Sequence, residues 1–197
     1  MIFKEFEYKY YAQDIKLKDF IALMNKLGYN ERLDISSWDT YYVKPGNNEE
    51  FQRYRQSNNP ELTKKKKTQE ANNWHREEID LPLDSNKTNE KLVEAYVAMD
   101  GYEKNFSIYK SCFIFWKDYV NYVYYITYNE NMQELNRFIE VEINKSKIDE
   151  LLSERDKEIG SFDGVVQALN IAALELKELG LIPQNRLKKS LFELYLK

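Results

Sequence analysis

Charged residues recur at alternate positions in several short stretches of the chain, the spacing at which a β-strand points successive side chains to opposite faces. Residues 5–9 place Glu5, Glu7 and Lys9 on one face and Phe6 and Tyr8 on the other. A single strand of this kind would bury its aromatic face and leave its charges in water. Carboxylates and an amine on one face could equally bind a metal ion and an anion, so the reading depends on how often the pattern returns.

Later stretches repeat this alternation with complementary charges. The residues that share a face within their own strands are Arg53 and Arg55; Arg76, Glu78 and Asp80; Lys110; and Glu140 and Glu142. In the run Lys64 to Lys67 only alternate lysines can share a face, so Lys65 or Lys67 would join this set; a solvated edge strand is the alternative. The residues between the charges are mostly Phe, Tyr, Val and Ile, which suit a packed face. A sheet that covers its apolar face with helices and curls its charged face inward, as a closed or nearly closed barrel, accounts for both faces.

Carboxylates clustered inside a barrel need positive charge beside them, because burying an unpaired ion costs several kcal/mol. They could pair with the Arg and Lys side chains in a purely structural network. They could instead hold Mg²⁺ or Mn²⁺, which prefer oxygen ligands, and leave the cations to cradle a multiply charged anion such as a phosphate chain. Carboxylates, a metal ion and arginines together are the machinery of phosphoryl transfer.

The composition limits the other possibilities. With 197 residues, of which 43% are hydrophobic, the chain can bury a core, and we expect one domain over residues 1–197. Its 29 Lys and Arg nearly balance its 33 Asp and Glu, which indicates no clear nucleic-acid partner and no membrane partner. Cys112 is the only cysteine and His75 the only histidine, which disfavours a zinc site or a Ser-His-Asp hydrolase. Without a signal peptide or an apolar span, a cytoplasmic protein is predicted.

Helical periodicity and turn residues divide the chain into alternating elements of an α+β protein. We predict strands over residues 5–9, 38–43, 51–55, 62–67, 74–81, 106–115, 122–128 and 138–143. We predict helices over residues 16–27, 88–99, 148–152, 162–174 and 189–196.

Taken in order, these motifs resemble the CYTH superfamily, also called the triphosphate tunnel metalloenzymes. They are Glu5-x-Glu7-x-Lys9, Asp39-x-Tyr41-Tyr42, Arg53-x-Arg55, Leu62-Thr63-x-Lys65, Arg76-x-Glu78-x-Asp80, Phe138-x-Glu140-x-Glu142 and Leu179-Gly180-Leu181 with Ser190. The resemblance covers nearly the whole chain. It implies an eight-stranded antiparallel β tunnel with helices packed outside, which binds a triphosphate. Family members are inorganic, thiamine or RNA triphosphatases, or class IV adenylyl cyclases.

The resemblance also implies a role for each charged residue in a metal-dependent triphosphatase. Catalysis would involve Glu5, Glu7, Lys9 and Glu78. The metal, Mg²⁺ or Mn²⁺, would be held by Glu5, Glu7, Glu140, Glu142 and Asp80. The phosphates of inorganic, nucleoside or thiamine triphosphate would be held by Lys9, Arg53, Arg55, Lys65, Arg76 and Lys110.

Three positions depart from the family pattern. Cys112 stands where the Lys-x-Arg strand carries its arginine, Val43 replaces a common acidic residue, and Glu130 replaces the aspartate before the last strand. The tyrosines around residues 122–128 also predict a tyrosine-rich lumen that would favour a base or another planar group.

Two other functions remain open on the sequence. A class IV-type adenylyl cyclase would use the same tunnel to make cyclic AMP from ATP, although the His-Phe pair associated with those cyclases is absent upstream of Glu5. A non-catalytic tunnel would bind or sequester a nucleotide without turning it over. The sequence also leaves open whether the chain forms a homodimer through its terminal helices.

Overall fold

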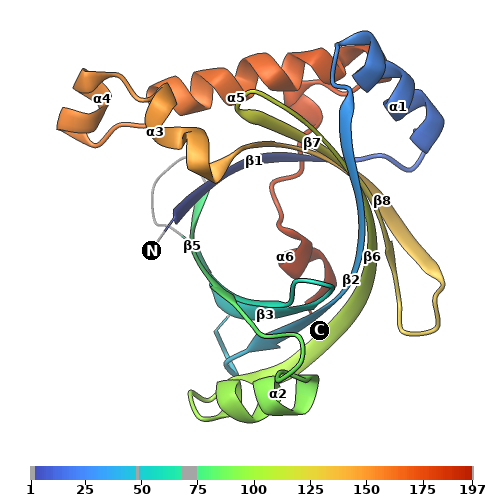
Figure 1. Ribbon diagram of the computed structural model, residues 1–197, viewed down its shortest axis with the longest axis vertical. Helices are drawn as coiled ribbons and strands as arrows, with labels where there is room; N and C mark the ends of the chain where they lie inside the picture. The colour runs from blue at the N-terminus through green and yellow to red at the C-terminus, as the bar shows by residue number, and fades with distance from the viewer. Residues whose placement is uncertain (1–2, 48, 68–74, 197) are drawn as a thin grey trace.

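The computed structural model describes residues 3–47, 49–67 and 75–196 (Figure 1). Its strands are β1 Phe3–Tyr11, β2 Glu31–Val43, β3 Glu50–Gln56, β4 Glu61–Lys67, β5 His75–Pro82, β6 Glu103–Lys117, β7 Val120–Tyr128 and β8 Glu134–Ile143. They form a closed barrel in the order β1-β5-β4-β3-β2-β6-β7-β8, and every neighbouring pair is antiparallel. The predicted α+β class and the closed eight-stranded antiparallel barrel are confirmed. Trp74, where the fifth strand was predicted to begin, lies outside the described residues.

The first strand closes the ring by pairing with two different strands. Residues 3–6 of β1 pair with β5, whereas residues 7–11 pair with β8. In the second half Glu7 lies opposite Glu142, and Lys9 lies opposite Glu140. Because paired residues point to the same side of a sheet, this register brings the charged faces of β1 and β8 together inside the ring.

Helices cover the outer face of the ring on opposite sides (Figure 1). The helices of the described residues are α1 Leu17–Lys26, α2 Glu90–Ala98, α3 Ile148–Leu151, α4 Glu154–Ile159, α5 Asp163–Glu175 and α6 Leu191–Tyr195, with 3-10 turns η1 Lys145–Lys147, η2 Leu176–Leu179 and η3 Pro183–Asn185, and all but α6 lie outside the ring. Asn89 is the N-cap of α2, and its side chain accepts a hydrogen bond from the backbone N–H of Leu92. Within residues 3–47, 49–67 and 75–196, no helix combines the length and the apolar character needed to cross a bilayer.

The aromatic residues of β1 anchor the helices to the outer face. Phe6 and Tyr8 are 1% and 2% exposed, and the ring of Phe6 lies 5.3 Å from that of Phe162, just before α5. The hydroxyl of Tyr8 donates a 2.7 Å hydrogen bond to Asn170 in α5. Burying an aromatic side chain of this size stabilises the fold by roughly 2 kcal/mol, so the apolar half of the alternation holds the barrel and its helices together.

The predicted tyrosine-rich lumen is wrong. Tyr122 and Tyr124 point outward, and their hydroxyls donate hydrogen bonds to the carbonyls of Ala172 and Ile15. The alternation of β7 turns Val123 toward the cavity in their place. Among the described residues that line the cavity, Tyr41 is the only tyrosine.

Helix α6 differs from the other helices because it lies across one end of the ring (Figure 1). Phe192 stacks on Phe51 with 4.4 Å between the ring centroids, and it also contacts Tyr41 and Phe106. The hydroxyl of Tyr195 lies 2.8 Å from that of Thr127. The aromatic side chains of α6 therefore close this end of the barrel.

Candidate active site

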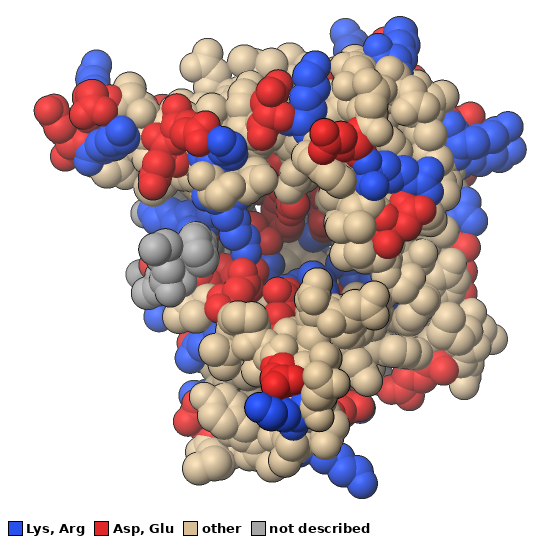
Figure 2. Space-filling view, in the orientation of Figure 1, with Lys and Arg blue, Asp and Glu red and all other residues tan. Residues whose placement is uncertain are grey.

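The ring encloses a cavity of about 300 Å³. Figure 2 shows the hollow at its centre, with acidic and basic side chains inside it. The cavity is lined by all the predicted site residues whose side chains are described: Glu5, Glu7, Lys9, Arg53, Arg55, Lys65, Glu78, Asp80, Lys110, Glu140 and Glu142. Arg76 belongs to β5, but its side chain lies outside the described part of the chain. The structure thus brings together residues that are more than 130 positions apart in the sequence, such as Glu7 and Glu142.

Lys9 lies between two carboxylates. Its ammonium is 3.1 Å from Glu7 on its own strand and 2.8 Å from Glu140 on β8, and its side chain is 6% exposed. Burial by itself would lower the pKa of Lys9, but Glu140 and Glu7 raise it above its ordinary value. Burial would likewise raise the pKa of Glu140, yet the charges of Lys9 and Lys110 hold it below the usual range. The lysine and Glu140 are therefore a charged pair at neutral pH.

Glu142 lies at the more acidic side of the cavity. Burial raises its pKa to about 7, and the nearby carboxylates of Glu140, Glu7 and Glu5 add to the rise. A 2.9 Å hydrogen bond from Asn121 acts in the opposite direction. Burial and the neighbouring carboxylates therefore disfavour a full negative charge on Glu142 at neutral pH.

Arg55 is oriented by a carboxylate that our list of site residues omitted. Asp39 on β2 accepts two hydrogen bonds of 2.9 Å from the Arg55 guanidinium and is 0% exposed. Burial would raise the pKa of Asp39, but Arg55 and the neighbouring Arg53 and Lys110 hold it well below the usual range. Asp39 was visible in the sequence only as part of the Asp39-x-Tyr41-Tyr42 motif, two positions before Tyr41 on the same face.

Arg53 is oriented in a similar way by β4. Its guanidinium lies 3.0 Å from Glu61 and donates a 3.0 Å hydrogen bond to the hydroxyl of Thr63. Glu61 was also missing from the predicted site. It has the same strand parity as Thr63 and Lys65, which is the signal that would have identified it.

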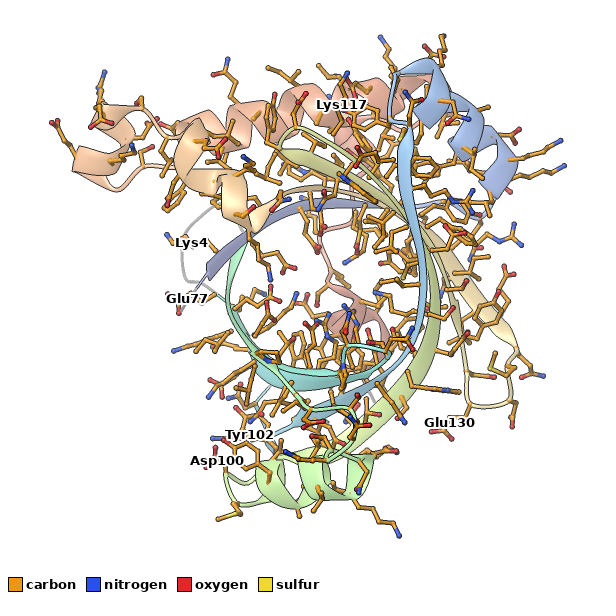
Figure 3. The ribbon with its side chains drawn as sticks, in the orientation of Figure 1. Lys4, Glu77, Asp100, Tyr102, Lys117 and Glu130 are labelled. Atoms are coloured by element: carbon orange, nitrogen blue, oxygen red, sulfur yellow. The ribbon has the colours of Figure 1, made fainter. Side chains whose placement is uncertain are left out.

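The structure decides which lysine of the run 64–67 points inward. Lys65 lies 2.6 Å from Glu5 and 3.3 Å from Glu78 inside the cavity. Lys67 is exposed and pairs with Glu193 of α6 at 3.5 Å. Outside the ring, Lys4 and Glu77, the neighbours of Glu5 and Glu78, lie on the opposite face of the same strands (Figure 3).

Lys145 is a cation of the cavity that the sequence did not reveal. It follows β8 directly, in η1, and its ammonium lies 2.9 Å from Glu78 and 2.7 Å from Asp80. Strand alternation ends at Ile143, so a period of two could not place this side chain. Lys145 also lines an adjoining cavity of about 200 Å³ with Glu5, Asn121 and Glu142.

Two of the positions that depart from the family pattern, Cys112 and Glu130, differ in where they lie. Lys110 lies 3.9 Å from Asp39 and 4.3 Å from the ring centre of Tyr125. Cys112 lines the cavity two residues farther along β6, and burial raises the pKa of its thiol, so this position carries no charge at neutral pH. Glu130, in contrast, is exposed in the turn between β7 and β8, outside the ring (Figure 3).

The described residues include no group of three or more His, Cys, Asp and Glu side chains already arranged to hold a metal ion. The carboxylates of the cavity are engaged by lysines instead, as the alternative of a structural ion-pair network predicted. Their donor atoms are nonetheless all carboxylate oxygens, the ligands that Mg²⁺ and Mn²⁺ prefer. The residues therefore fit such an ion by their chemistry. Lys9 and Lys65 would have to release their carboxylate partners, Glu140 and Glu5, when the ion binds.

Solved structures with this fold extend over nearly the whole chain. The PH1012 protein of Pyrococcus horikoshii aligns with a TM-score of 0.66 at 15% identity, covering 98% of this chain and 99% of that one. A "putative adenylate cyclase" of Vibrio parahaemolyticus aligns with a TM-score of 0.59 at 16% identity, covering 97% and 96%. A chain of the Schizosaccharomyces pombe Mediator head module aligns with a TM-score of 0.56 at 11% identity, covering 90% and 94%.

The sequence matches no protein-family model and no curated protein. At these identities the structural likeness concerns the fold alone, and the fold is the closed eight-stranded antiparallel barrel with helices outside that the sequence predicted. One fold can carry different functions, so the function must be argued from the cavity itself.

Proposed function

We propose that this protein belongs to the CYTH superfamily and is a metal-dependent hydrolase of a triphosphate-containing substrate. The observation that carries the proposal is the distribution of charge inside the cavity. Arg53, Arg55 and Lys65 project into it from β3 and β4, while carboxylates project from β1 and β8. A phosphate chain with its metal ion matches both groups at once.

The cations would bind the phosphate oxygens. Arginine is suited to this role because its planar guanidinium donates two parallel hydrogen bonds to a phosphate. Asp39 and Glu61 hold Arg55 and Arg53 in place before the ligand arrives, which reduces the entropy lost on binding. Lys9, Lys65 and Lys110 would add positive charge along the chain of phosphates, and Arg76 is proposed for the same role from its place on β5.

Glu5, Glu7, Glu140 and Glu142 would hold Mg²⁺ or Mn²⁺, with Asp80 nearby at the end of β5. When bound, the ion supplies charge neutralisation at the phosphate oxygens. Glu78 is 2% exposed and lies within reach of Lys65 and Lys145. We assign it to orient the attacking water, because a carboxylate fixed by two ammonium groups accepts a hydrogen bond in one direction.

Glu7→Gln tests the assignment, since it keeps the shape of the side chain and removes its charge. We expect the metal-dependent release of phosphate from ATP and from inorganic triphosphate to fall by about 100-fold. Glu77→Gln is the matched control, because Glu77 lies on the outer face and is exposed. If Glu7→Gln releases phosphate at the wild-type rate, the assignment is wrong.

The same assay separates the alternative functions by their products. A hydrolase gives ADP and phosphate from ATP, whereas an adenylyl cyclase gives cyclic AMP and pyrophosphate. Tight binding of ATP without either product would identify a tunnel that only sequesters its ligand.

A further inference from the structure

A further cavity lies on the outer face of the barrel, between the start of α2 and the turn that joins β7 and β8 (Figure 1). It measures about 240 Å³ and shares no lining residue with the central cavity. Strand alternation explains the separation, because it points Tyr41 of β2 into the ring and Trp38 and Thr40 out of it. We call this second site the outer groove.

The sheet register builds the floor of the outer groove. Trp38 is paired with Gln56 of β3 on one side and with Tyr109 of β6 on the other. The rings of Trp38 and Tyr109 lie 5.5 Å apart, so the indole is supported from one side. In the next outward-facing row Thr40 is paired with Ser107, and their hydroxyl oxygens are 3.1 Å apart. The floor therefore offers an aromatic ring beside an amide and two hydroxyls.

Two carboxylates stand on the walls of the outer groove, and only one of them is neutralised. Glu90, in the first turn of α2, lies 2.8 Å from the ammonium of Lys104. Glu130 comes from the turn between β7 and β8 and is exposed (Figure 3). Within residues 3–47, 49–67 and 75–196 it has no ion-pair or hydrogen-bond partner. The groove therefore keeps one negative charge that the protein does not compensate.

An aromatic ring next to a free carboxylate suits an organic cation. Tryptophan attracts an ammonium or a guanidinium over its ring more strongly than the other aromatic side chains do. In the described part of the chain no lysine or arginine lies over Trp38. A carboxylate such as Glu130 accepts a charge-assisted hydrogen bond from the same cation.

Other kinds of ligand fit the outer groove less well. An anion would meet the charge of Glu130, and an apolar ligand would take the carboxylate and the hydroxyls out of water without giving them a partner. The aliphatic stem of an amine or a guanidine, in contrast, can pack on the indole while its charged end stays among the polar groups. A cavity of about 240 Å³ is smaller than most pockets for drug-sized ligands, so we expect it to hold one cationic group with its stem.

We propose that the outer groove binds an organic cation, an ammonium or guanidinium group on an aliphatic stem, between the ring of Trp38 and the carboxylate of Glu130. A free polyamine and a basic side chain of a peptide both present this group. The site is separate from the central cavity, and it is proposed whether or not that cavity turns over a triphosphate.

Calorimetric titration of the full chain with spermidine and, separately, with a short peptide that carries a single arginine tests the proposal. We expect Glu130→Gln and Trp38→Leu each to weaken binding by about 10-fold, because each removes one of the two groups that contact the cation. Glu94→Gln is the matched control, since Glu94 is exposed one turn farther along α2 and does not line the groove. Glu7→Gln controls for the carboxylates of the central cavity and should bind the probes like the wild-type protein.

The outcomes decide both the site and the source of the cation. Tighter binding of spermidine supports the proposal with a free polyamine as ligand, and tighter binding of the peptide supports it with a protein partner. The proposal is overturned if the wild-type protein binds neither probe, or if Glu130→Gln binds as tightly as Glu94→Gln. Binding that Glu7→Gln weakens instead would place the cation in the central cavity and also overturn it. Should Trp38→Leu fail to fold by circular dichroism, Glu130→Gln, at an exposed position in a turn, still decides the question.

Discussion

The two faces of the barrel are built from the same strands but held by different forces. On the outer face, Phe6 and Tyr8 are almost completely buried against helices. On the inner face of the same strand, Glu5, Glu7 and Lys9 meet other charges across a cavity. Apolar packing is non-directional and gains from every buried methylene, whereas a buried ion pair gains little because its desolvation offsets its attraction.

This difference indicates a division of labour. The outer face can supply most of the stability, and the inner face can keep charges that cost stability but bind a ligand. Substitutions on the two faces should therefore separate stability from activity.

Phe6→Ala should have the largest effect on stability. It removes a 1% exposed ring that packs against Phe162, and we expect the free energy of unfolding to fall by about 4 kcal/mol. Urea denaturation followed by circular dichroism measures the loss. Ile79→Ala, an exposed position on the outer face of β5, is the control and should change stability by less than about 0.5 kcal/mol. A loss near that of the control would contradict the importance of the outer face.

Asp39→Asn should have the largest stability effect on the inner face. It removes the carboxylate that accepts two hydrogen bonds from Arg55 and leaves only Glu61, 3.4 Å away, beside the guanidinium; breaking a buried pair in this way costs about 3 kcal/mol. The double variant Asp39→Asn/Arg55→Gln removes both charges and should regain part of the loss. No recovery in the double variant would show that Asp39 acts through something other than this pair.

Asp39 should also make the stability of the protein depend on pH in the acidic range. Arg55 and its neighbours hold the folded pKa of Asp39 below the unfolded value. Its contribution is therefore complete above about pH 4 and is lost as the pH falls below that value. Unfolding measured at decreasing pH should show a shallower decline for Asp39→Asn than for the wild-type protein.

Alkaline pH should produce a smaller effect through the buried tyrosines. Burial raises the pKa of Tyr10 and of Tyr29 to about 12. The pKa values of both tyrosines in the folded protein therefore lie above their value in the unfolded chain. The two protonated tyrosines contribute fully to stability below about pH 10, and this contribution is lost as the pH rises toward 12. Tyr29→Phe should lessen this alkaline loss in a denaturation series, and an unchanged slope would argue against a role for Tyr29.

Much of the cavity could be predicted from the sequence because strand alternation is a local property. Once Glu5, Glu7 and Lys9 were placed on one face, the matching charges on β3, β5 and β8 followed from the same period of two. The structure places these side chains around one cavity, as the alternation predicted. The helices that cover the apolar face were also visible, from their own periodicity.

The features of the fold and the cavity that could not be predicted from the sequence depend on contacts between distant parts of the chain. The division of β1 between β5 and β8 is a matter of pairing, which alternation does not specify. The number of tyrosines around residues 122–128 predicted a tyrosine-rich lumen, but the pairing of β7 turns Tyr122 and Tyr124 outward. Lys145 reaches the cavity from a 3-10 turn, and α6 closes the barrel through tertiary contacts of a five-residue helix that has little stability of its own.

The central claim is that the inward-facing charges form a binding site for a triphosphate. Calorimetric titration of the non-hydrolysable imido analogue of ATP, with Mn²⁺ present, tests it most directly. We predict one-to-one binding that Arg53→Gln weakens by about 30-fold or more, because Arg53 points into the cavity. Lys66→Gln, an exposed position on the outer face of β4, should bind like the wild-type protein. Equal affinity of the two variants, or no binding by the wild-type protein, would contradict the claim.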